Sequence, residues 1–380
     1  MEVETIQKNL KLFLNENDAE KVNQTWDEKS KEFREFWNER ILNDKVTEIS
    51  EVEIDQIVRT LDRNAKGNTK GSEAVAKAMI PQGVWRRMFS EIKRTKELQK
   101  ALTKILTEKD DEEVIKAIDH LYKINLGKKN SLTGKSANAI NIMLFAYNPA
   151  RYLSVISLND RKKIIDYFGF ESGPDFEADS PGKRVVLSNK AILKGFQKFG
   201  LQQTSRILST FLYIPVMRQE WKSDSEEESY SSTESEGQEE KVSLSQEEFY
   251  MEKELENFLI KNWDKTELGK KYDLIEEDGN LVSQQYLTDI GKIDILVKDK
   301  KTNQYVVIEL KRSQTSDDTI GQLLRYMGWL EEKKTNGKPT KGIIIAGSYD
   351  KKLVYALKKI KDVEIYQYQI DFKLTEFKEK

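Results

Sequence analysis

Cysteine is absent from this chain of 380 residues, and histidine occurs once, as His120. The lack of thiols excludes disulfides, thiolate metal sites and a cysteine nucleophile. A single imidazole excludes a histidine-rich zinc cluster, and His120 lies in a helical pattern without a predicted role. No run of about 18 apolar residues occurs, so no membrane-spanning helix is expected. The first residues lack the basic start and apolar core of a signal peptide, so a cytoplasmic protein is expected.

Charge is unevenly distributed along the chain, although the formal net charge is only −2. Residues 1–222 contain 38 basic and 32 acidic side chains, whereas residues 223–240 contain 8 acidic side chains and no basic one. The first region is therefore mildly basic, which permits binding to a polyanion without requiring it.

The acidic segment marks a boundary between domains. Its sequence, "SDSEEESYSSTESEGQEE", is rich in Ser and Glu and has almost no apolar residues. Such a segment cannot bury enough surface to offset the entropy lost on ordering, so residues 223–245 are predicted to be a disordered linker. An alternative is that the acidic strip mimics DNA and competes for a basic surface. The linker separates a domain at residues 1–222 from one at residues 246–380.

Helical periodicity dominates residues 1–222. In "DEKSKEFREFWNERIL", the side chains of Phe33, Phe36, Trp37 and Ile41 recur at helical spacing. The segment "DEEVIKAIDHLYKINLG" repeats the pattern and is predicted to end at Gly127. This mainly α-helical domain is expected to recognise a target or to regulate its neighbour.

Strand patterns appear after the linker. A helix is predicted over "SQEEFYMEKELENFLIKNW", followed by strands at residues 293–297 and 305–310 and a helix over residues 317–333. The segment "KGIIIAGS" predicts a buried strand, "KKLVYALKKI" a short helix, and "VEIYQYQIDFKL" a final strand. This order is typical of an α/β sandwich.

Three charged side chains interrupt the predicted strands at Asp294, Glu309 and Lys311. Glu309 and Lys311 are two residues apart on one strand and therefore point to the same face. Antiparallel pairing could bring Asp294 beside Glu309. Two carboxylates in a dry site repel each other unless a cation lies between them, and oxygen ligands favour Mg²⁺ or Mn²⁺. The pattern predicts metal-assisted phosphodiester hydrolysis.

These residues fit the signature of the PD-(D/E)XK nucleases, here as "ID…ELK". With the flanking "FYMEKELENFLIKNW", "TDIGKIDIL" and "VVIELKRSQTSDDTIGQLLRYMGWL", the segment from about residue 247 to 348 resembles the catalytic domain of NucS-type endonucleases. The order of a helical region before the nuclease is similar to that of restriction or phage-defence nucleases such as Shedu. The resemblance implies a restriction-endonuclease-like fold with a central mixed sheet flanked by helices. It also implies a Mg²⁺-dependent DNA endonuclease in which Mn²⁺ substitutes.

The resemblance also implies the roles of individual residues. Asp294 and Glu309 correspond to metal ligands, helped by the carbonyl of Leu310, and Lys311 corresponds to the residue that positions the attacking water. Further residues expected at the site are Gln322 and Tyr326, which share a helix face, and Glu252 as a carboxylate offered to the metal, with Glu256 as the alternative.

Basic residues suggest where DNA, the expected partner, could bind. In "WRRMFSEIKRTK", Arg86, Arg87, Lys93 and Arg94 accompany an apolar stripe, and their face could contact phosphates or simply be solvated. Near the predicted active site, the candidates are Lys311, Arg312 and Arg325. A homo-oligomer is also expected.

Four other interpretations remain open. Glu309 and Lys311 could form an ordinary surface pair. The domain could be an inactive nuclease fold that binds nucleic acid or assembles, or a nuclease directed to RNA. The triplet Gly134-Lys135-Ser136 resembles the end of a P-loop, but Lys129 stands where its first glycine is required, and a helix precedes it.

Overall fold

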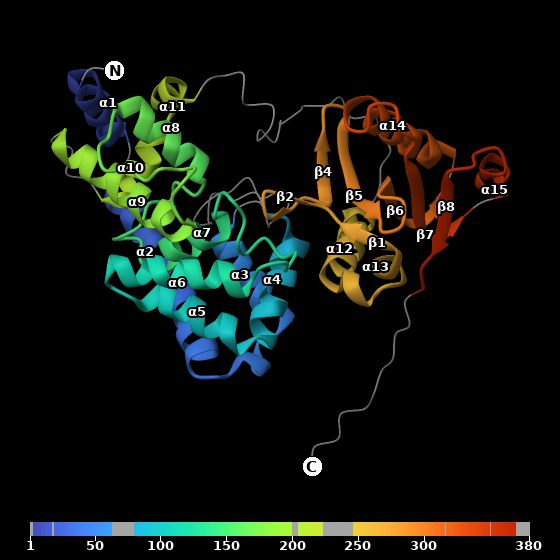
Figure 1. Cartoon of the computed structure of the whole chain (residues 1–380), viewed down its shortest axis with the longest axis horizontal. Helices are drawn as coiled ribbons and strands as arrows, with labels where there is room; N and C mark the ends of the chain where they lie inside the picture. Colours follow the sequence, from blue (N-terminus) through green and yellow to red (C-terminus); the bar gives the residue numbers. More distant parts are fainter. Residues whose placement is uncertain are drawn as a thin grey trace, which may run out of the picture. The chain divides into compact units, whose positions relative to one another are not determined.

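The computed structural model describes residues 3–16, 19–62, 80–199, 204–222, 246–315, 317–349 and 351–369. The chain divides into two compact units (Figure 1). The helical unit comprises Met1–Glu234 together with Glu276–Leu281, and the sheet unit comprises Ser235–Ile275 and Val282–Lys380. The linker predicted at residues 223–245 lies outside the described residues. Within the described ranges, no helix is long and apolar enough to cross a membrane.

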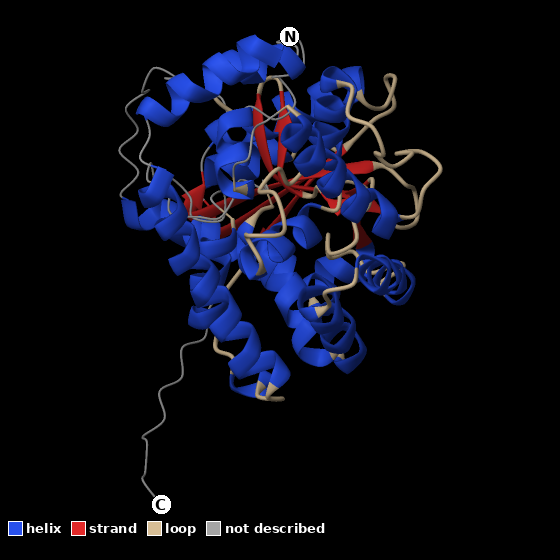
Figure 2. Ribbon diagram, turned by 90° about the vertical axis from the view of Figure 1, so that its left-hand side faces the viewer, coloured by secondary structure: helices blue, strands red, loops and turns tan. Residues whose placement is uncertain are grey.

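The helical unit confirms the prediction of a mainly α-helical N-terminal region (Figure 2). Its α-helices are α1 (Val3–Glu16), α2 (Ala19–Phe36), α3 (Glu51–Leu61), α4 (Gln82–Arg94), α5 (Lys96–Thr107), α6 (Asp111–Ile124), α7 (Asn138–Tyr147), α8 (Leu158–Phe168), α9 (Pro181–Lys198), α10 (Ser205–Leu212) and α11 (Pro215–Trp221). A π-helical turn, Trp37–Leu42, continues α2, and a 3₁₀ turn covers Val46–Glu48. The stripe of Phe33, Phe36, Trp37 and Ile41 is buried throughout.

Local side-chain chemistry determines where these helices begin and end. Ser50 and Asp110 accept hydrogen bonds from the first-turn amides of α3 and α6, which satisfies groups that lack a helical partner. The predicted helix end at Gly127 is wrong, because α6 ends at Ile124. The Asn125 side chain there donates to Asn130 and Thr133, which turns the chain before Gly127 is reached.

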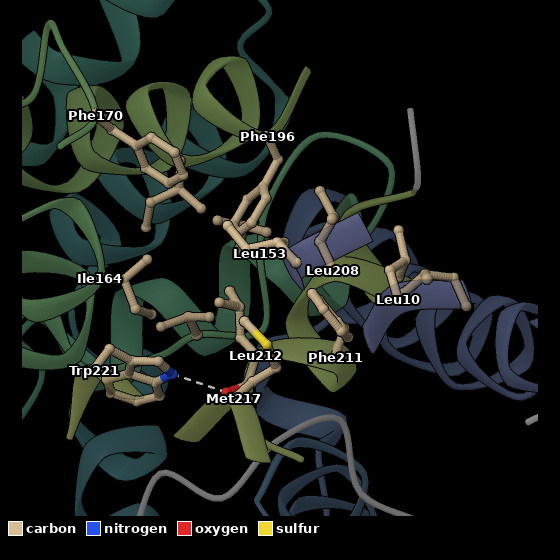
Figure 3. Close-up of a cluster of buried hydrophobic side chains, with 14 of the residues drawn as sticks. Leu10, Leu153, Ile164, Phe170, Phe196, Leu208, Phe211, Leu212, Met217 and Trp221 are labelled. Atoms are coloured by element: carbon tan, nitrogen blue, oxygen red, sulfur yellow. Dashed lines mark hydrogen bonds between the residues drawn. The ribbon is translucent and has the colours of Figure 1, made fainter. Parts of the chain in front are cut away.

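One hydrophobic core joins segments far apart in the sequence (Figure 3). It contains side chains from α1, α8, α9, α10 and α11, with Phe196 at 0% exposure. The ring of Phe196 lies edge-on to Phe168 and Phe170, with centroids 5.3 and 5.0 Å away. The buried indole of Trp221 donates to the carbonyl of Leu212 at 2.9 Å, so its only polar group is satisfied.

Replacing Phe196 with alanine is expected to lower the free energy of unfolding by about 3–5 kcal/mol, because a large ring leaves a closed core and a cavity remains. Urea denaturation at 25 °C measures this change. Leu126→Ala is the matched control, since Leu126 is 85% exposed and its truncation should change stability by less than about 0.5 kcal/mol. Equal effects of the two substitutions would contradict the packing argument.

A short hairpin formed by β2 (Glu276–Glu277) and β3 (Asn280–Leu281) belongs to the helical unit. Its turn residues Asp278 and Gly279 both have left-handed backbones, with φ of 51° and 75°, as a tight two-residue turn requires. Within this unit, Ser131 Oγ accepts from the N–H of Leu281 at 2.7 Å. The loop that contains Gly134 follows helix α6 rather than a strand, so it lacks the context of a P-loop.

The sheet unit confirms a C-terminal α/β arrangement with a mixed sheet. Its elements are α12 (Gln246–Asn262), a 3₁₀ turn (Trp263–Lys265), α13 (Glu267–Lys271), β1 (Tyr272–Leu274), β4 (Gln284–Thr288), β5 (Gly291–Asp299), β6 (Tyr305–Thr315), α14 (Asp317–Lys333), β7 (Lys341–Tyr349), α15 (Lys351–Leu357) and β8 (Val363–Gln367). The strand order is β1-β5-β6-β7-β8, and β4 also pairs with β5. Strands β6, β7 and β8 are parallel, and the remaining pairs are antiparallel.

Strand β6 occupies the middle of this sheet, and its residues 306–310 are all buried. Helix α14 packs over it, since Leu323 and Leu330 share a core cluster with Val307. The close approach of the helix depends on Gly342 of β7, where an added Cβ would lie 2.7 Å from Leu323 Cδ2. A charged side chain on this face of β6 is therefore shielded from solvent by helix α14.

Candidate active site

Strands β5 and β6 lie side by side in the sheet (Figure 1), and each contributes one carboxylate to the same place. Their antiparallel ladder pairs Ile295 with Ile308. Asp294, which precedes Ile295, and Glu309, which follows Ile308, therefore lie opposite each other just beyond this pair. Asp294 Oδ2 accepts from the backbone N–H of Leu310 at 2.9 Å. A side chain of β5 thus satisfies the backbone of β6 where the ladder between these strands ends.

Glu309 and Lys311 form an ion pair on one face of β6. The Lys311 Nζ donates to Glu309 Oε1 at 2.8 Å. The Glu309 side chain is only 1% exposed, whereas that of Lys311 is 27% exposed. The ordinary surface pair considered from the sequence therefore does not describe these residues, because the carboxylate is buried in a central strand.

Burial and mutual repulsion raise the proton affinity of both carboxylates. Burial, and then the charge of Asp294, raise the pKa of Glu309 to about 7, although Lys311 opposes the change. Burial also raises the pKa of Asp294, against the hydrogen bond from Leu310. Burial alone would lower the pKa of Lys311, but attraction to Glu309 outweighs it and the pKa is raised. Lys311 is therefore an ammonium group at neutral pH.

Helix α12 offers two acidic side chains on one face, Glu252 and Glu256. Glu256 is 5% exposed, and its Oε2 accepts from the Gln285 amide at 2.7 Å. Burial, and then the charge of Asp294, raise the pKa of Glu256 to about 8. Glu252 is half-buried, and its charge raises the pKa of both Asp294 and Glu309. Both candidates thus reach the site, with Glu252 on its more exposed side.

Helix α14 places Tyr326 and Gln322 at the same site. Burial, and then the charges of Glu309 and Asp294, raise the pKa of Tyr326, whose side chain also shares a hydrogen bond with Gln322. The Tyr326 hydroxyl packs against Gly291, where φ is 133° and an added Cβ would lie 2.7 Å from the oxygen. Glycine at this turn therefore leaves room for the tyrosine.

The chemistry of these side chains fits a divalent cation. Among the described residues, Glu309 Oε2 is a buried oxygen without a hydrogen-bond partner. Two neighbouring carboxylates that repel each other, Glu309 buried and Asp294 half-buried, favour a hard cation between them. No three acidic or imidazole side chains within the described ranges are grouped to hold a metal. Asp294 and Glu309 are the carboxylates that could hold such an ion, and Glu252 and the Leu310 carbonyl stay predicted further donors.

The basic residues predicted on helix α4 are largely engaged within the helical unit. Arg86 donates to Asp55 from both Nε and Nη2, at 2.8 and 2.7 Å. Arg87 is 9% exposed, and its Nε donates to the Lys129 carbonyl. These contacts favour a structural role for both guanidinium groups.

The other predicted nucleic-acid contacts differ in their exposure. The Lys93 Nζ donates to the Ile49 carbonyl at 2.6 Å, whereas Arg94 and Arg325 are exposed. The Arg312 side chain lies outside the described part of the structure. Binding of nucleic acid by these residues stays a prediction.

Sequence comparisons link the sheet unit to a nuclease family. Residues 260–372 match the family model of the Endonuclease NucS C-terminal domain. Endonuclease NucS of Methanocaldococcus jannaschii is 38% identical over 76 residues, which are 20% of this chain and 28% of that protein. Endonuclease NucS of Sulfolobus acidocaldarius is 32% identical over 88 residues, which are 23% of this chain and 34% of that protein. The predicted resemblance to NucS-type endonucleases is thereby confirmed for this part of the chain.

The matched region spans only about a third or less of the length of these curated relatives. A repair endonuclease from Pyrococcus abyssi is a similar solved structure, with 22% identity and a TM-score of 0.25. That comparison covers 33% of this chain and 47% of the other.

Proposed function

We propose that the sheet unit is a metal-dependent endonuclease that hydrolyses phosphodiester bonds of DNA. The convergence of Asp294, Glu309 and Lys311 in one partly buried site carries the proposal. The match of residues 260–372 to the NucS C-terminal domain, and the name endonuclease borne by the relatives, support it. A restriction-endonuclease-like architecture is part of the same proposal.

Asp294 and Glu309 would hold Mg²⁺ or Mn²⁺, with Glu252 and the Leu310 carbonyl as further donors. A bound ion of this kind supplies Lewis-acid activation of a phosphate oxygen and a more acidic water. Lys311 is the cation at the exposed rim, where it can align the attacking water and stabilise negative charge on the phosphate. The water oxygen bonds to phosphorus as the ester bond to the leaving oxygen breaks. One proton of the attacking water passes to solvent, and the leaving oxygen takes up a proton from solvent.

Cleavage assays with purified full-length protein test this proposal. Supercoiled plasmid, linear duplex DNA, single-stranded DNA and single-stranded RNA are each incubated with Mg²⁺, with Mn²⁺ or with EDTA. We expect metal-dependent cutting of DNA that is lost in EDTA and in Asp294→Asn, because the variant removes a charged ligand without changing side-chain size. Activity on RNA alone would redirect the proposal to an RNA nuclease. A wild-type protein that cuts nothing would favour the binding or assembly role.

The biological setting remains a separate prediction. A role in restriction or phage defence, and assembly into a homo-oligomer, both rest on the family resemblance. Free nuclease activity would harm a cell, so we expect the helical unit or the acidic segment to restrain it.

A further inference from the structure

Gln285 breaks the regular backbone of strand β4 directly opposite Asp294. On either side of it, Gln284 pairs with Ile295 and Tyr286 pairs with Ile293. Gln285 itself has a φ of 52°, in the left-handed region that residues other than glycine seldom occupy. Such a conformation costs on the order of 1–3 kcal/mol and persists only where surrounding contacts stabilise it.

The Gln285 amide joins two carboxylates that come from different elements. Its Nε2 donates to Glu256 Oε2 at 2.7 Å and approaches Asp294 Oδ1 at 3.5 Å. A primary amide has two N–H groups, so a single side chain can donate to both. The preceding residue strengthens the same connection, because Gln284 Nε2 donates to Asn257 Oδ1 at 2.7 Å. Adjacent glutamines of β4 thereby hold adjacent residues of α12.

Core packing does not explain this conformation. Gln285 is exposed, so little apolar burial is gained by bending the strand there. In a regular strand, successive side chains point to opposite faces of the sheet. The left-handed backbone at Gln285 interrupts this alternation. The bonds to Glu256 and Asp294 are the contacts that the bend makes.

We propose that Gln285 is a positioning residue whose amide fixes the Asp294 carboxylate relative to Glu256 of α12. Asp294 then keeps Oδ2 on the Leu310 amide and its charge beside Glu309. The inference rests on the proposed function for the identity of the ion. The hydrogen bonds that join Gln285 to Glu256 and Asp294 do not depend on that ion.

Two readouts test the role, and Gln367→Leu is the matched control. Gln367 is a glutamine on β8 whose Nε2 donates only to a backbone carbonyl, Gly347 O, among the described contacts. Calorimetric titration with Mn²⁺ should give at least about a tenfold weaker affinity for Gln285→Leu, since outer-shell partners of ligands typically contribute that much. The control should remain within about twofold of the wild type.

The second readout needs no metal. The Leu310 amide donates to Asp294 Oδ2, and this bond is expected to slow its hydrogen exchange, so Gln285→Leu should speed the exchange about tenfold in the metal-free protein. Unchanged exchange and unchanged Mn²⁺ affinity would overturn the positioning role. If the wild type neither binds Mn²⁺ nor cleaves DNA, the proposed function fails, and the exchange rate alone decides whether Gln285 positions Asp294.

Gln285→Gly separates positioning from a purely structural effect. Glycine adopts a φ of 52° without strain but lacks the amide. We expect its unfolding midpoint to stay at or above that of the wild type while the Leu310 amide exchanges as fast as in Gln285→Leu. Slow exchange in the glycine variant would show that the bent backbone, and not the amide, holds Asp294, and would overturn the proposal.

Discussion

Replacing Lys311 with methionine is expected to lower the rate of DNA cleavage by at least about a thousandfold while leaving Mn²⁺ binding in place. The ammonium group has no lone pair for a metal, so its loss should not remove a ligand. It is, however, a cation that reaches the exposed rim of this site, as its 27% exposure beside the buried Glu309 shows. Its charge is secure at neutral pH, because attraction to Glu309 raises the pKa of Lys311 despite burial.

Single-turnover cleavage with saturating Mn²⁺ measures the rate, and calorimetry measures the metal affinity of the same protein. The control is Lys298→Met, which removes a half-buried lysine of β5 whose Nζ lies 4.8 Å from the centroid of the Tyr305 ring, its partner on β6. We expect this variant to cleave at the wild-type rate. Full activity of Lys311→Met, or an equal loss in both variants, would remove Lys311 from the proposed mechanism.

The metal-binding pattern distinguishes the roles of neighbouring residues. Asp294→Asn should lose both Mn²⁺ affinity and cleavage, whereas Lys311→Met should lose cleavage alone. Gln285→Leu should lie between them, with weakened affinity and cleavage that recovers in part at high metal concentration. These three profiles follow from a ligand, a substrate-side cation and a positioning residue acting on one carboxylate pair.

Much of the site could be predicted from the sequence because its spacing is regular. Glu309 and Lys311 share a face by the two-residue period of a strand, and Gln322 and Tyr326 share one by the helical turn. Both relations depend only on local geometry, which propensity and pattern determine. The pairing of Asp294 with Glu309 followed from one further assumption, an antiparallel connection through a short turn, and the ladder between β5 and β6 has that direction.

Gln285 could not be identified in this way, because its role depends on a departure from strand geometry. An alternating pattern gives no sign that one residue adopts a positive φ, and its partner Glu256 lies 29 residues earlier on another element. The arginines of α4 show the opposite difficulty. Their charge suggested a surface that binds phosphates, but Asp55 and the Lys129 carbonyl, which accept from them, are distant in sequence.

The buried carboxylate on β6 should also make the metal-free protein less stable as pH rises. Its pKa lies at about 7 in the folded state, whereas an exposed glutamate has 4.5. Below pH 4.5 Glu309 is protonated in both the folded and the unfolded states, and it destabilises neither. Between these values the folded state binds more protons, so stability falls as pH rises through about 7. At pH 8 the ionised group costs the fold about 3 kcal/mol, at about 1.4 kcal/mol for each pH unit.

Glu309→Gln is therefore expected to be more stable than the wild type by about 3 kcal/mol at pH 8, and equal to it near pH 4.5, while losing cleavage. Urea denaturation in EDTA across this pH range measures the difference, and Glu332→Gln, at a side chain 74% exposed, should change little. Adding Mn²⁺ at pH 8 should reverse the order, because a cation that binds only the folded state stabilises the wild type more, the more tightly it binds.

A variant that gains no stability in EDTA would show that Lys311 already neutralises Glu309. A variant that gains stability but binds Mn²⁺ as tightly as the wild type would remove Glu309 from the ligand set. The expected pair of results, greater stability without metal and weaker binding with it, would mean that the carboxylate is kept in the core for its chemistry and against the stability of the fold.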